Sequence, residues 1–316
     1  MKPDPLYICP YELHSKAALN KRSSRRIFPG LLLRRGPGFA CLHPWPELGD
    51  LDLSDQIAAL KSGARTPLIH QAFACLSIDG AARAKSVSLF RDLAPPVSHA
   101  TLTDASNDWQ SLRDSGFTCF KIKGSPASMT SLGTRLNEGS RRQWRFDFNG
   151  TLTAADTREW LTSLTSHQRD RLDFIEDPCP YNAQDWAGLA ASSGCALAAD
   201  RHLPSPETKA DFLVIKPALT DPGVLHSLQN HPARWVFTSY MDHPLGQLYA
   251  GYLAARTFLT HPEKESLCGL TTHPLFEKTS FSEKLGSGPT LETPEGTGLG
   301  FDDLLEKLPW KALTTF

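Results

Sequence analysis

The sequence lacks three features that would each have restricted its function. Its 316 residues carry 33 basic and 34 acidic side chains, so no excess of one charge favours general nucleic-acid binding. No apolar run approaches the length of a membrane span, and the N-terminal residues contain no signal-like apolar segment. The seven cysteines are scattered without a Cys-x-x-Cys pair, which favours reduced thiols over a disulfide framework or a zinc site. We therefore expect a cytoplasmic protein with no nucleic-acid or membrane partner.

Five charged residues are present at nearly regular intervals, each at the end of a short apolar segment. They are Lys123, Asp147, Glu176, Asp200 and Lys216. Successive members are 16 to 29 residues apart, which suits one strand, one helix and two loops per interval. The carboxyl ends of the strands in a parallel βα-barrel all lie at one mouth. The spacing therefore predicts such a barrel, with these five side chains gathered at its mouth.

The alternation of side chains along a strand predicts which neighbours share the barrel interior. Lys121 has the same parity as Lys123, and Arg145 and Asn149 have the same parity as Asp147. The opposite face of the segment around Asp147 is aromatic and suits packing beneath an outer helix. Lys121, Arg145 and Asn149 are therefore expected to point into the barrel as well.

The first part of the chain does not show the alternation of strand and helix that predicts the barrel. Residues 1–95 predict an α+β domain, with strands at 30–35 and 38–44 joined by a short Gly/Pro turn. Helices are expected to start near Ser54 and at Pro67, because proline is favoured in the first turn of a helix.

Residues 96–275 change to an alternation of strand and helix. Eight strand-like segments follow one another, at 98–104, 117–123, 144–149, 172–178, 195–200, 211–217, 235–240 and 268–272. Eight is the strand number of a βα-barrel. Residues 276–316 form a tail that is expected to pack back on the first domain.

The three carboxylates predict a metal site. Asp147, Glu176 and Asp200 on successive strands can converge on one hard divalent cation, and oxygen-only ligation suits Mg²⁺ or Mn²⁺ rather than zinc. Without a cation these carboxylates would repel one another. Lys123 and Lys216, on the second and sixth strands, would face each other across the metal. A lysine whose pKa is lowered by a neighbouring ammonium group can remove a proton next to a carboxylate.

Five short motifs carry a resemblance to a known family. FKIK (120–123), DFN (147–149), EDP (176–178), AAD (198–200) and VIKP (214–217) resemble the enolase superfamily, in its muconate-lactonizing-enzyme-like subgroup. Within that subgroup the chain looks most like the o-succinylbenzoate synthase family, on the segments GFACLHPWP, VIKPALTDP and SYMDHPLG. The resemblance implies an α/β fold, a modified TIM barrel of the (β/α)7β type with an N-terminal α+β capping domain.

The resemblance also implies an activity, that of a carbon–oxygen lyase of menaquinone biosynthesis. Such an enzyme dehydrates 2-succinyl-6-hydroxy-2,4-cyclohexadiene-1-carboxylate to 2-succinylbenzoate. A lysine base and Mg²⁺, which stabilise an enediolate between them, are a known pattern of this superfamily. The implied cofactor is Mg²⁺, with Mn²⁺ as the alternative, and the implied partner is a small-molecule carboxylate. No oligomeric state is predicted.

Each residue that matches a family motif receives an implied role. Asp147, Glu176 and Asp200 would hold the metal. Lys123 would be the general base and then the acid that helps hydroxide to leave. Lys216 would stabilise the enediolate from the opposite side.

The remaining matches concern the substrate. Lys121 would neutralise its carboxylate, and Arg145 and Asn149 would line the rim of the site. Ser239, at the end of the seventh strand, would contact the succinyl arm. The early loop 14–26 would close over the pocket.

One departure and several alternatives remain open at this point. Arg201 follows Asp200 where family members commonly carry Glu, and such a change can alter metal affinity. An N-acylamino acid racemase, a dipeptide epimerase or a muconate cycloisomerase would use almost the same site. A barrel that binds a carboxylate without converting it is the alternative of another class. His43, His202 and His243 are expected to be surface or packing residues, since two opposed lysines need no histidine base.

Overall fold

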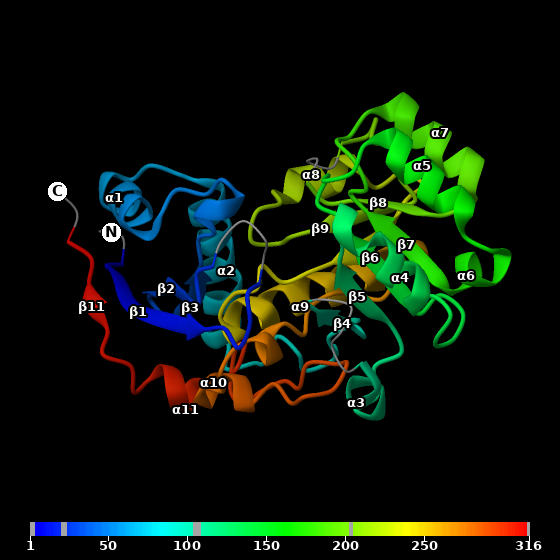
Figure 1. Ribbon diagram of the computed structural model, residues 1–316. Coiled ribbons are helices and arrows are strands. Elements are labelled where there is room, and N and C mark those ends of the chain that lie inside the picture. Colours follow the sequence, from blue (N-terminus) through cyan, green and yellow to red (C-terminus); the bar gives the residue numbers. More distant parts are fainter. Residues whose placement is uncertain (1–3, 20–23, 104–108, 202–204, 315–316) are drawn as a thin grey trace.

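The computed structural model describes residues 4–19, 24–103, 109–201 and 205–314. An antiparallel sheet domain lies beside a parallel barrel, and Figure 1 shows the first in blue and the second in green and yellow. His202 and part of the loop 14–26 lie outside the described residues. Among the helices that are described, none is long and apolar enough to cross a bilayer.

The N-terminal domain is built on a small antiparallel sheet with the order β11-β1-β2-β3. Its strands are β1 (Leu6–His14), β2 (Ile27–Arg35), β3 (Gly38–Leu42) and β11 (Lys311–Ala312). The two expected strands correspond to β2 and β3. No strand was predicted for β1. Proline is usually confined to strand edges, and β11 pairs only with Tyr7 and Ile8, so Pro10 has a neighbouring strand on one side of β1 only. β1 pairs along its whole length with β2.

Two helices follow β3 in the sequence, the second of which packs on the sheet, and local capping fixes where each begins. α1 (Leu53–Ser62) starts after Asp52, whose side chain accepts a hydrogen bond from Asp55 N. α2 (Pro67–Arg83) starts after Thr66, whose hydroxyl accepts one from Ile69 N. A side-chain oxygen at this position satisfies one of the free N–H groups of the first turn. The expected helix starts are therefore confirmed to within one residue.

Seven parallel strands form the barrel sheet, in the order β10-β9-β8-β7-β6-β5-β4. They are β4 (Ala100–Leu102), β5 (Phe120–Lys123), β6 (Trp144–Asp147), β7 (Leu172–Glu176), β8 (Leu197–Ala199), β9 (Phe212–Ile215) and β10 (Arg234–Phe237). Each strand neighbours the next one in the sequence, which is the simplest right-handed βα arrangement. The sheet therefore curls with all carboxyl ends at one mouth.

The eighth barrel segment is only a pair of bridging residues. Cys268 pairs in parallel with Ser98, and Gly269 pairs with Thr238. Cys268 N donates to Val97 O and Gly269 N donates to Phe237 O, each at 2.8 Å. The segment 268–272 thus joins the last strand to the first, and the expected barrel is present with a very short closing strand.

Helices pack around the outside of the barrel. They are α3 (Trp109–Asp114), α4 (Met129–Arg135), α5 (Ala154–Ser163), α6 (Ser166–Arg171), α7 (Ala183–Ser193), α8 (Pro222–Ser227) and α9 (Pro244–Thr260). Aromatic residues on the outward faces of the strands fill the layer beneath them, as Phe146 and Phe148 do against Trp160 of α5. The outward aromatic face of β6 is therefore confirmed, and the polar face of this strand lies inside.

The barrel interior below the mouth is a small apolar cluster of its own. It consists of Phe174, Ala198, Phe212, Val214 and Val236. Phe174 and Ala198 each lie two residues before an expected metal ligand on the same strand face. An apolar layer therefore lies beneath the charged residues of β7 and β8 at the mouth.

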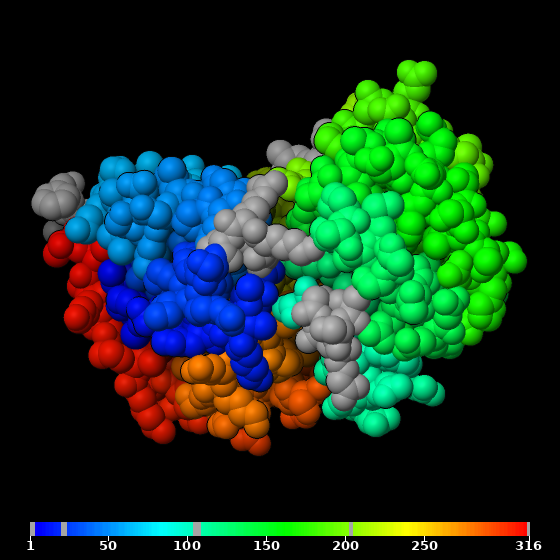
Figure 2. Space-filling model, in the orientation of Figure 1, coloured from blue at the N-terminus to red at the C-terminus, as the bar shows by residue number. Residues whose placement is uncertain are grey.

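The C-terminal tail returns to the N-terminal domain. After the short helices α10 (Ser280–Glu283) and α11 (Asp302–Leu305), β11 pairs with β1. In Figure 2 the red C-terminal residues and the blue N-terminal ones form one continuous surface. The exact domain limits, 1–95 and 96–275, stay a prediction.

Candidate active site

A cavity of about 330 Å³ opens at the carboxyl ends of the barrel strands. Most of the site residues predicted from the sequence line it: Lys121, Lys123, Asp147, Asn149, Asp200, Lys216 and Ser239. Lys123, Asp147 and Glu176 end three adjacent strands and pair with one another in one row of the sheet. The parallel register therefore delivers the charged residues to the same level.

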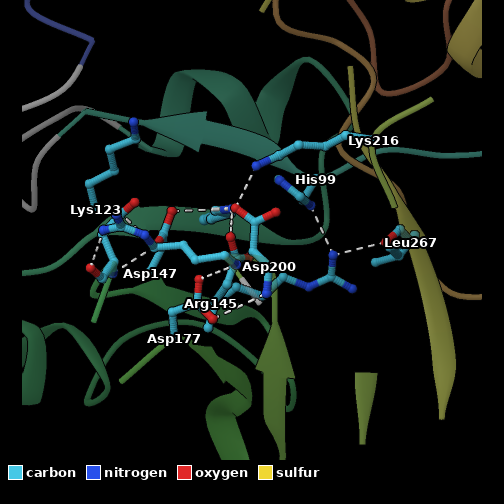
Figure 3. A network of polar contacts seen from close by, with 12 residues as sticks. His99, Lys123, Arg145, Asp147, Asp177, Asp200, Lys216 and Leu267 are labelled. Atoms are coloured by element: carbon cyan, nitrogen blue, oxygen red, sulfur yellow. Dashed lines mark hydrogen bonds and ion pairs between the residues drawn. The ribbon is translucent and has the colours of Figure 1, made fainter. Parts of the chain in front are cut away.

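The buried lysines and carboxylates form a tight network of ion pairs, which Figure 3 shows from close by. Lys121 Nζ lies 2.5 Å from Glu176 Oε1 and 3.4 Å from Asp147 Oδ2. Lys216 Nζ lies 2.6 Å from Asp200 Oδ2. Two ammonium groups thus neutralise part of the charge of three carboxylates. We call these five residues the lysine–carboxylate cluster.

Lys123 behaves differently from the other two lysines. Its Nζ donates a hydrogen bond of 2.6 Å to the backbone oxygen of Leu19, which belongs to the N-terminal domain. Among the described residues it has no carboxylate within ion-pair distance. The amine therefore lies in the cavity without a strong partner for its positive charge.

The pKa values of the three lysines follow from these contacts. Burial lowers the pKa of Lys123; Asp147 opposes this shift, and the charges of Lys121 and Lys216 reinforce it. Burial would also lower the pKa of Lys121, but Glu176 and Asp147 outweigh it and raise that pKa. The same balance, with Asp200 as the partner, raises the pKa of Lys216. Lys123 is therefore the lysine that loses its proton most easily.

The carboxylates do not ionise alike. Burial, reinforced by the charges of Asp147 and Asp200, raises the pKa of Glu176 to about 8, although Lys121 opposes the shift. For Asp147, burial acts in the same direction, but the three nearby lysines outweigh it and lower the pKa. Like charges held this close cannot all ionise freely without a cation.

The donor set suits a hard divalent cation. Two buried carboxylate oxygens, Glu176 Oε2 and Asp200 Oδ1, have no hydrogen-bond partner in the described part of the chain. Buried polar atoms are rarely left without a partner, and oxygen-only ligands favour Mg²⁺ or Mn²⁺. Within the described ranges, however, no three His, Cys, Asp or Glu side chains are placed to hold one ion together. The ion pairs account for this, because each turns a carboxylate oxygen toward an ammonium group.

Asp177 is a functional candidate that the sequence analysis missed. Its side chain accepts hydrogen bonds from Asp200 N at 3.1 Å and Arg201 N at 2.8 Å. Burial, reinforced by Asp200 and Asp147, raises the pKa of Asp177 to about 7. A positive φ of 39° at Asp177 turns it away from the alternation of the strand. It fixes the backbone that carries the third expected metal ligand.

Arg201, the departure from the family pattern, lies at the cavity and contacts the neighbouring loop. Its Nη1 donates to Asn149 O at 2.7 Å. Asn149 in turn donates from Nδ2 to Asp147 Oδ1 at 2.8 Å. Arg201 thus braces the residue that orients Asp147, where a carboxylate would instead have added a negative charge.

The structure separates the remaining predicted substrate residues. Ser239 lines the cavity, and its hydroxyl lies 2.7 Å from Thr272 Oγ1. Arg145 does not lie at the rim. It is fully buried below the cavity, where its Nε donates to Asp173 Oδ2 at 2.8 Å. Arg145 does point into the barrel, as the alternation along the strand predicted. The expected position at the rim was wrong, because Arg145 lies two residues before Asp147 in β6 and therefore deeper in the barrel.

The N-terminal domain closes one side of the cavity. Leu19 contacts Lys123 as described, and Leu48 is part of the lining. Trp45 Nε1 donates to Tyr240 O at 2.8 Å, and the Tyr240 hydroxyl donates to Asp50 at 3.0 Å. These contacts hold the domain against the segment that leaves β10.

The histidines expected to pack do so where they are described. His43 is buried, with Nδ1 2.9 Å from the Tyr11 hydroxyl. His243 is buried at the start of α9, where its side chain accepts a hydrogen bond from Leu245 N. Burial lowers the pKa of each to about 3, so both are uncharged near neutral pH.

The sequence analysis also missed the uncharged side of the cavity. His99, Thr101, Thr238 and Thr272 line it together with Ser239. They come from β4, from the end of β10 and from the closing segment. These side chains carry no charge, so the spacing of charged residues did not indicate them. The alternation of side chains along the first strand could have predicted that Thr101 points into the barrel.

Comparison with known proteins places this arrangement in a family. Models described as "O-succinylbenzoate synthase, N-terminal domain" and "Enolase C-terminal domain-like" match residues 6–82 and 104–216. An o-succinylbenzoate synthase from Bdellovibrio bacteriovorus is 30% identical, over 96% of this chain and 97% of that protein.

Solved structures agree on the fold. A mandelate racemase/muconate lactonizing protein from Herpetosiphon aurantiacus matches with a TM-score of 0.75 and 15% identity, over 94% of this chain and 97% of the other. An o-succinylbenzoate synthase from Thermosynechococcus elongatus, solved with magnesium in its active site, matches with a TM-score of 0.64 and 22% identity. That match covers 87% of this chain and 95% of the other. The predicted barrel with an N-terminal capping domain is therefore confirmed.

Proposed function

We propose a reaction for this chain, which belongs to the o-succinylbenzoate synthase family of the enolase superfamily. It dehydrates 2-succinyl-6-hydroxy-2,4-cyclohexadiene-1-carboxylate to 2-succinylbenzoate and water, as a cytoplasmic enzyme of menaquinone biosynthesis. The observation that carries the proposal is the contrast among the three lysines at the mouth. Lys121 and Lys216 are ion-paired, whereas Lys123 is buried with a lowered pKa.

Lys123 has the properties of a general base. As a neutral amine it removes the proton from the ring carbon that bears the carboxylate. It then returns this proton to the departing hydroxyl group, which leaves as water, and the ring becomes aromatic. General acid–base catalysis is most efficient when the pKa of the group lies near the working pH, and the lowered pKa of Lys123 moves it in that direction.

The two other lysines serve as fixed positive charges. Their raised pKa values keep Lys121 and Lys216 protonated at neutral pH. Lys121 receives the substrate carboxylate, and Lys216 lies on the far side of the cavity, where it stabilises the enediolate. Charges that are already in position lower the barrier more than charges that must reorganise.

Asp147, Glu176 and Asp200 would hold Mg²⁺, with Mn²⁺ as the alternative. When bound, the cation supplies positive charge that offsets the negative charge developing on the substrate carboxylate. Two carboxylate oxygens without partners support this assignment.

The direct test is turnover of the cyclohexadiene substrate. The purified chain is mixed with Mg²⁺ and the substrate, the loss of diene absorbance is followed, and the product is identified by chromatography against 2-succinylbenzoate. Formation of 2-succinylbenzoate at an enzymatic rate is expected, and chelation of Mg²⁺ should abolish it.

The sister reactions are the alternatives in the same experiment. Racemisation of an N-succinyl amino acid, epimerisation of a dipeptide and cycloisomerisation of muconate are measured with the same preparation. Turnover of one of these without conversion of the cyclohexadiene would replace the proposed reaction. Binding of 2-succinylbenzoate with no turnover of any of the four would favour the carboxylate-binding barrel.

A further inference from the structure

The cavity has a charged side and an uncharged side. Strands β5 to β9 supply the lysine–carboxylate cluster, whereas β4, β10 and the closing segment supply hydroxyl groups and one imidazole. The uncharged side contains His99, Thr101, Thr238, Ser239 and Thr272. A ligand that places a carboxylate at the lysines can place other polar atoms against this second side.

The contact with Arg145 fixes the tautomer of His99. Arg145 Nη1 lies 2.8 Å from His99 Nδ1, as the dashed line in Figure 3 shows. A guanidinium group only donates hydrogen bonds, so Nδ1 must be the acceptor. Burial, reinforced by Arg145 and Lys121, holds the pKa of His99 well below its ordinary value, so the ring is neutral. Its single proton is therefore on Nε2.

Arg145 is itself held in place from two sides. Its Nε donates to Asp173 Oδ2 at 2.8 Å, and its Nη1 also donates to Leu267 O at 2.9 Å. The guanidinium lies over the ring of Phe174, 4.4 Å from the centroid. A neutral imidazole held by such a rigid cation cannot exchange its tautomer without losing a buried hydrogen bond.

The Nε2–H group of His99 is a donor that no described residue accepts from. It lies beside Gly269, where a Cβ would approach to 2.9 Å from His99 Nε2 and 2.9 Å from Thr238 Cγ2. Glycine at this position thus keeps the space next to the imidazole open. Thr238 Oγ1, whose side chain also lies next to Gly269, is buried and without a partner in the described part of the chain. We call His99, Thr238 and Gly269 the floor recess.

We propose that His99 Nε2–H donates a hydrogen bond to an oxygen of the succinyl arm of the substrate, and that Arg145 is the positioning residue that fixes this donor. The inference rests on the proposed function and deepens it. The arm carries a ketone and a terminal carboxylate, whose oxygens only accept hydrogen bonds. The floor recess supplies the matching donor.

Two conservative variants separate a ligand contact from a structural role. In His99→Asn the side-chain oxygen can still accept from Arg145, but no donor reaches the position of Nε2. In His99→Gln the amide nitrogen reaches that position, while the acceptor for Arg145 is displaced. We expect His99→Asn to raise KM and weaken binding of 2-succinylbenzoate by about tenfold, as for the loss of one hydrogen bond to a ligand. His99→Gln should stay within about threefold of the wild type.

The opposite order of the two variants would overturn the inference. If His99 served only to satisfy Arg145, His99→Gln would show the larger loss, in thermal stability as well as in binding. Melting temperatures of both variants are therefore recorded with the kinetics. Equal KM and equal affinity for His99→Asn and the wild type would also contradict the proposed contact.

A ligand without arm oxygens tests whether the contact is to the arm. 2-Butylbenzoate has the same ring carboxylate and an arm of the same length without oxygen. Its affinity should be the same for the wild type and His99→Asn, whereas that of 2-succinylbenzoate differs tenfold. An equal loss for both ligands would mean that His99 holds an ordered water or shapes the cavity, and would overturn the inference.

Failure of the proposed function gives a different result. A wild-type chain that neither converts the cyclohexadiene nor binds 2-succinylbenzoate would remove the proposed function together with the role of His99. A wild-type chain that converts the substrate, with an unaffected His99→Asn variant, would remove the role of His99 alone.

Discussion

Two buried clusters of charge in this molecule are built in opposite ways. The first is the lysine–carboxylate cluster at the barrel mouth. The second, the Asp79 cluster, joins the C-terminal tail to the N-terminal domain and consists of Asp79, Arg83 and Asp302. In the Asp79 cluster each oxygen of Asp79 has a donor: Leu299 N at 2.7 Å on one, and Phe39 N at 2.8 Å and Arg83 Nε at 2.6 Å on the other.

Arg83 is equally well satisfied. It pairs with Asp302 and donates from Nη2 to Gly300 O at 2.8 Å. Gly298, with φ of 56°, lets the tail approach, because a Cβ there would lie 2.1 Å from Asp79 Oδ1. Complete pairing of this kind is what a buried charge requires to stabilise a fold.

The cluster at the mouth lacks this balance. Glu176 Oε2 and Asp200 Oδ1 have no partner among the described residues, and three carboxylates share one cavity. The fold holds these groups together against their repulsion. In this molecule complete pairing marks the structural cluster and incomplete pairing the functional one.

The largest effect is expected from removing the base. Lys123→Ala should lower kcat about 10⁴-fold, the upper end for general acid–base catalysis, because one residue provides both proton transfers. Lys123→Arg keeps the positive charge but cannot give up its proton at neutral pH, so it should be as inactive. Turnover of the cyclohexadiene measures both variants. If Lys123→Arg retained activity, charge rather than proton transfer would be the role of this residue.

The next effect concerns stability and the Asp79 cluster. Asp79→Ala removes one of the two carboxylates that pair with Arg83 and leaves Leu299 N and Phe39 N without an acceptor. It should lower the free energy of unfolding by about 3–5 kcal/mol. The control is Asp303→Ala, which removes the exposed ion pair with Lys284 and should cost less than about 1 kcal/mol. Urea unfolding of the three proteins measures both values. Equal losses would contradict the view that pairing at Asp79 stabilises the contact between tail and domain.

The fold and the cluster at the mouth were predictable from the sequence, because both follow from regular spacing along the chain. Charged residues recurred at the ends of strand-like segments, and alternation along β6 gave the inward face of Asp147. Alternation does not give depth, however. Arg145 shares that face but lies lower, where Asp173 on the neighbouring strand holds it.

Other parts of the site carried no such signal. Asp177 has the wrong parity, and only its positive φ brings it to Asp200 N. His99 precedes a short strand without charged residues, so its tautomer and its recess depend on contacts across the barrel. No strand was predicted at β1, which contains Pro10. Each of these features depends on contacts between segments that are far apart in the sequence, so local sequence patterns do not predict them.

A third prediction tests the cost of incomplete pairing. Glu176→Gln removes one of the three carboxylate charges and keeps the shape of the side chain. Without Mg²⁺ and above pH 8, where Glu176 of the wild type is ionised, it should raise the free energy of unfolding by about 1–3 kcal/mol, because less repulsion is buried, while turnover is lost. Urea unfolding in a chelator and the cyclohexadiene assay measure the two effects. A destabilised Glu176→Gln variant would show that Lys121 and Glu176 form a net stabilising pair, as Asp79 and Arg83 do.

The smallest expected effect is a dependence of stability on pH. The pKa values of Glu176, Asp177 and Asp242 are raised to about 8, 7 and 7, mainly by burial. In the unfolded chain the same groups lose their protons near pH 4. Between about pH 4 and pH 8 the folded protein therefore retains protons that the unfolded chain has released, so the free energy of unfolding falls as pH rises.

Mg²⁺ should reverse this loss, because it binds the deprotonated carboxylates of the folded protein. Between pH 7 and pH 8 we expect the metal-free protein to lose about 1–2 kcal/mol, and the rise in melting temperature on adding Mg²⁺ to be larger at pH 8. Glu176→Gln should show a shallower loss, whereas Asp303→Ala should follow the wild type. If Mg²⁺ changed stability equally at both pH values, the carboxylates at the mouth would hold no cation in preference to their protons, and the distinction between the two clusters would disappear.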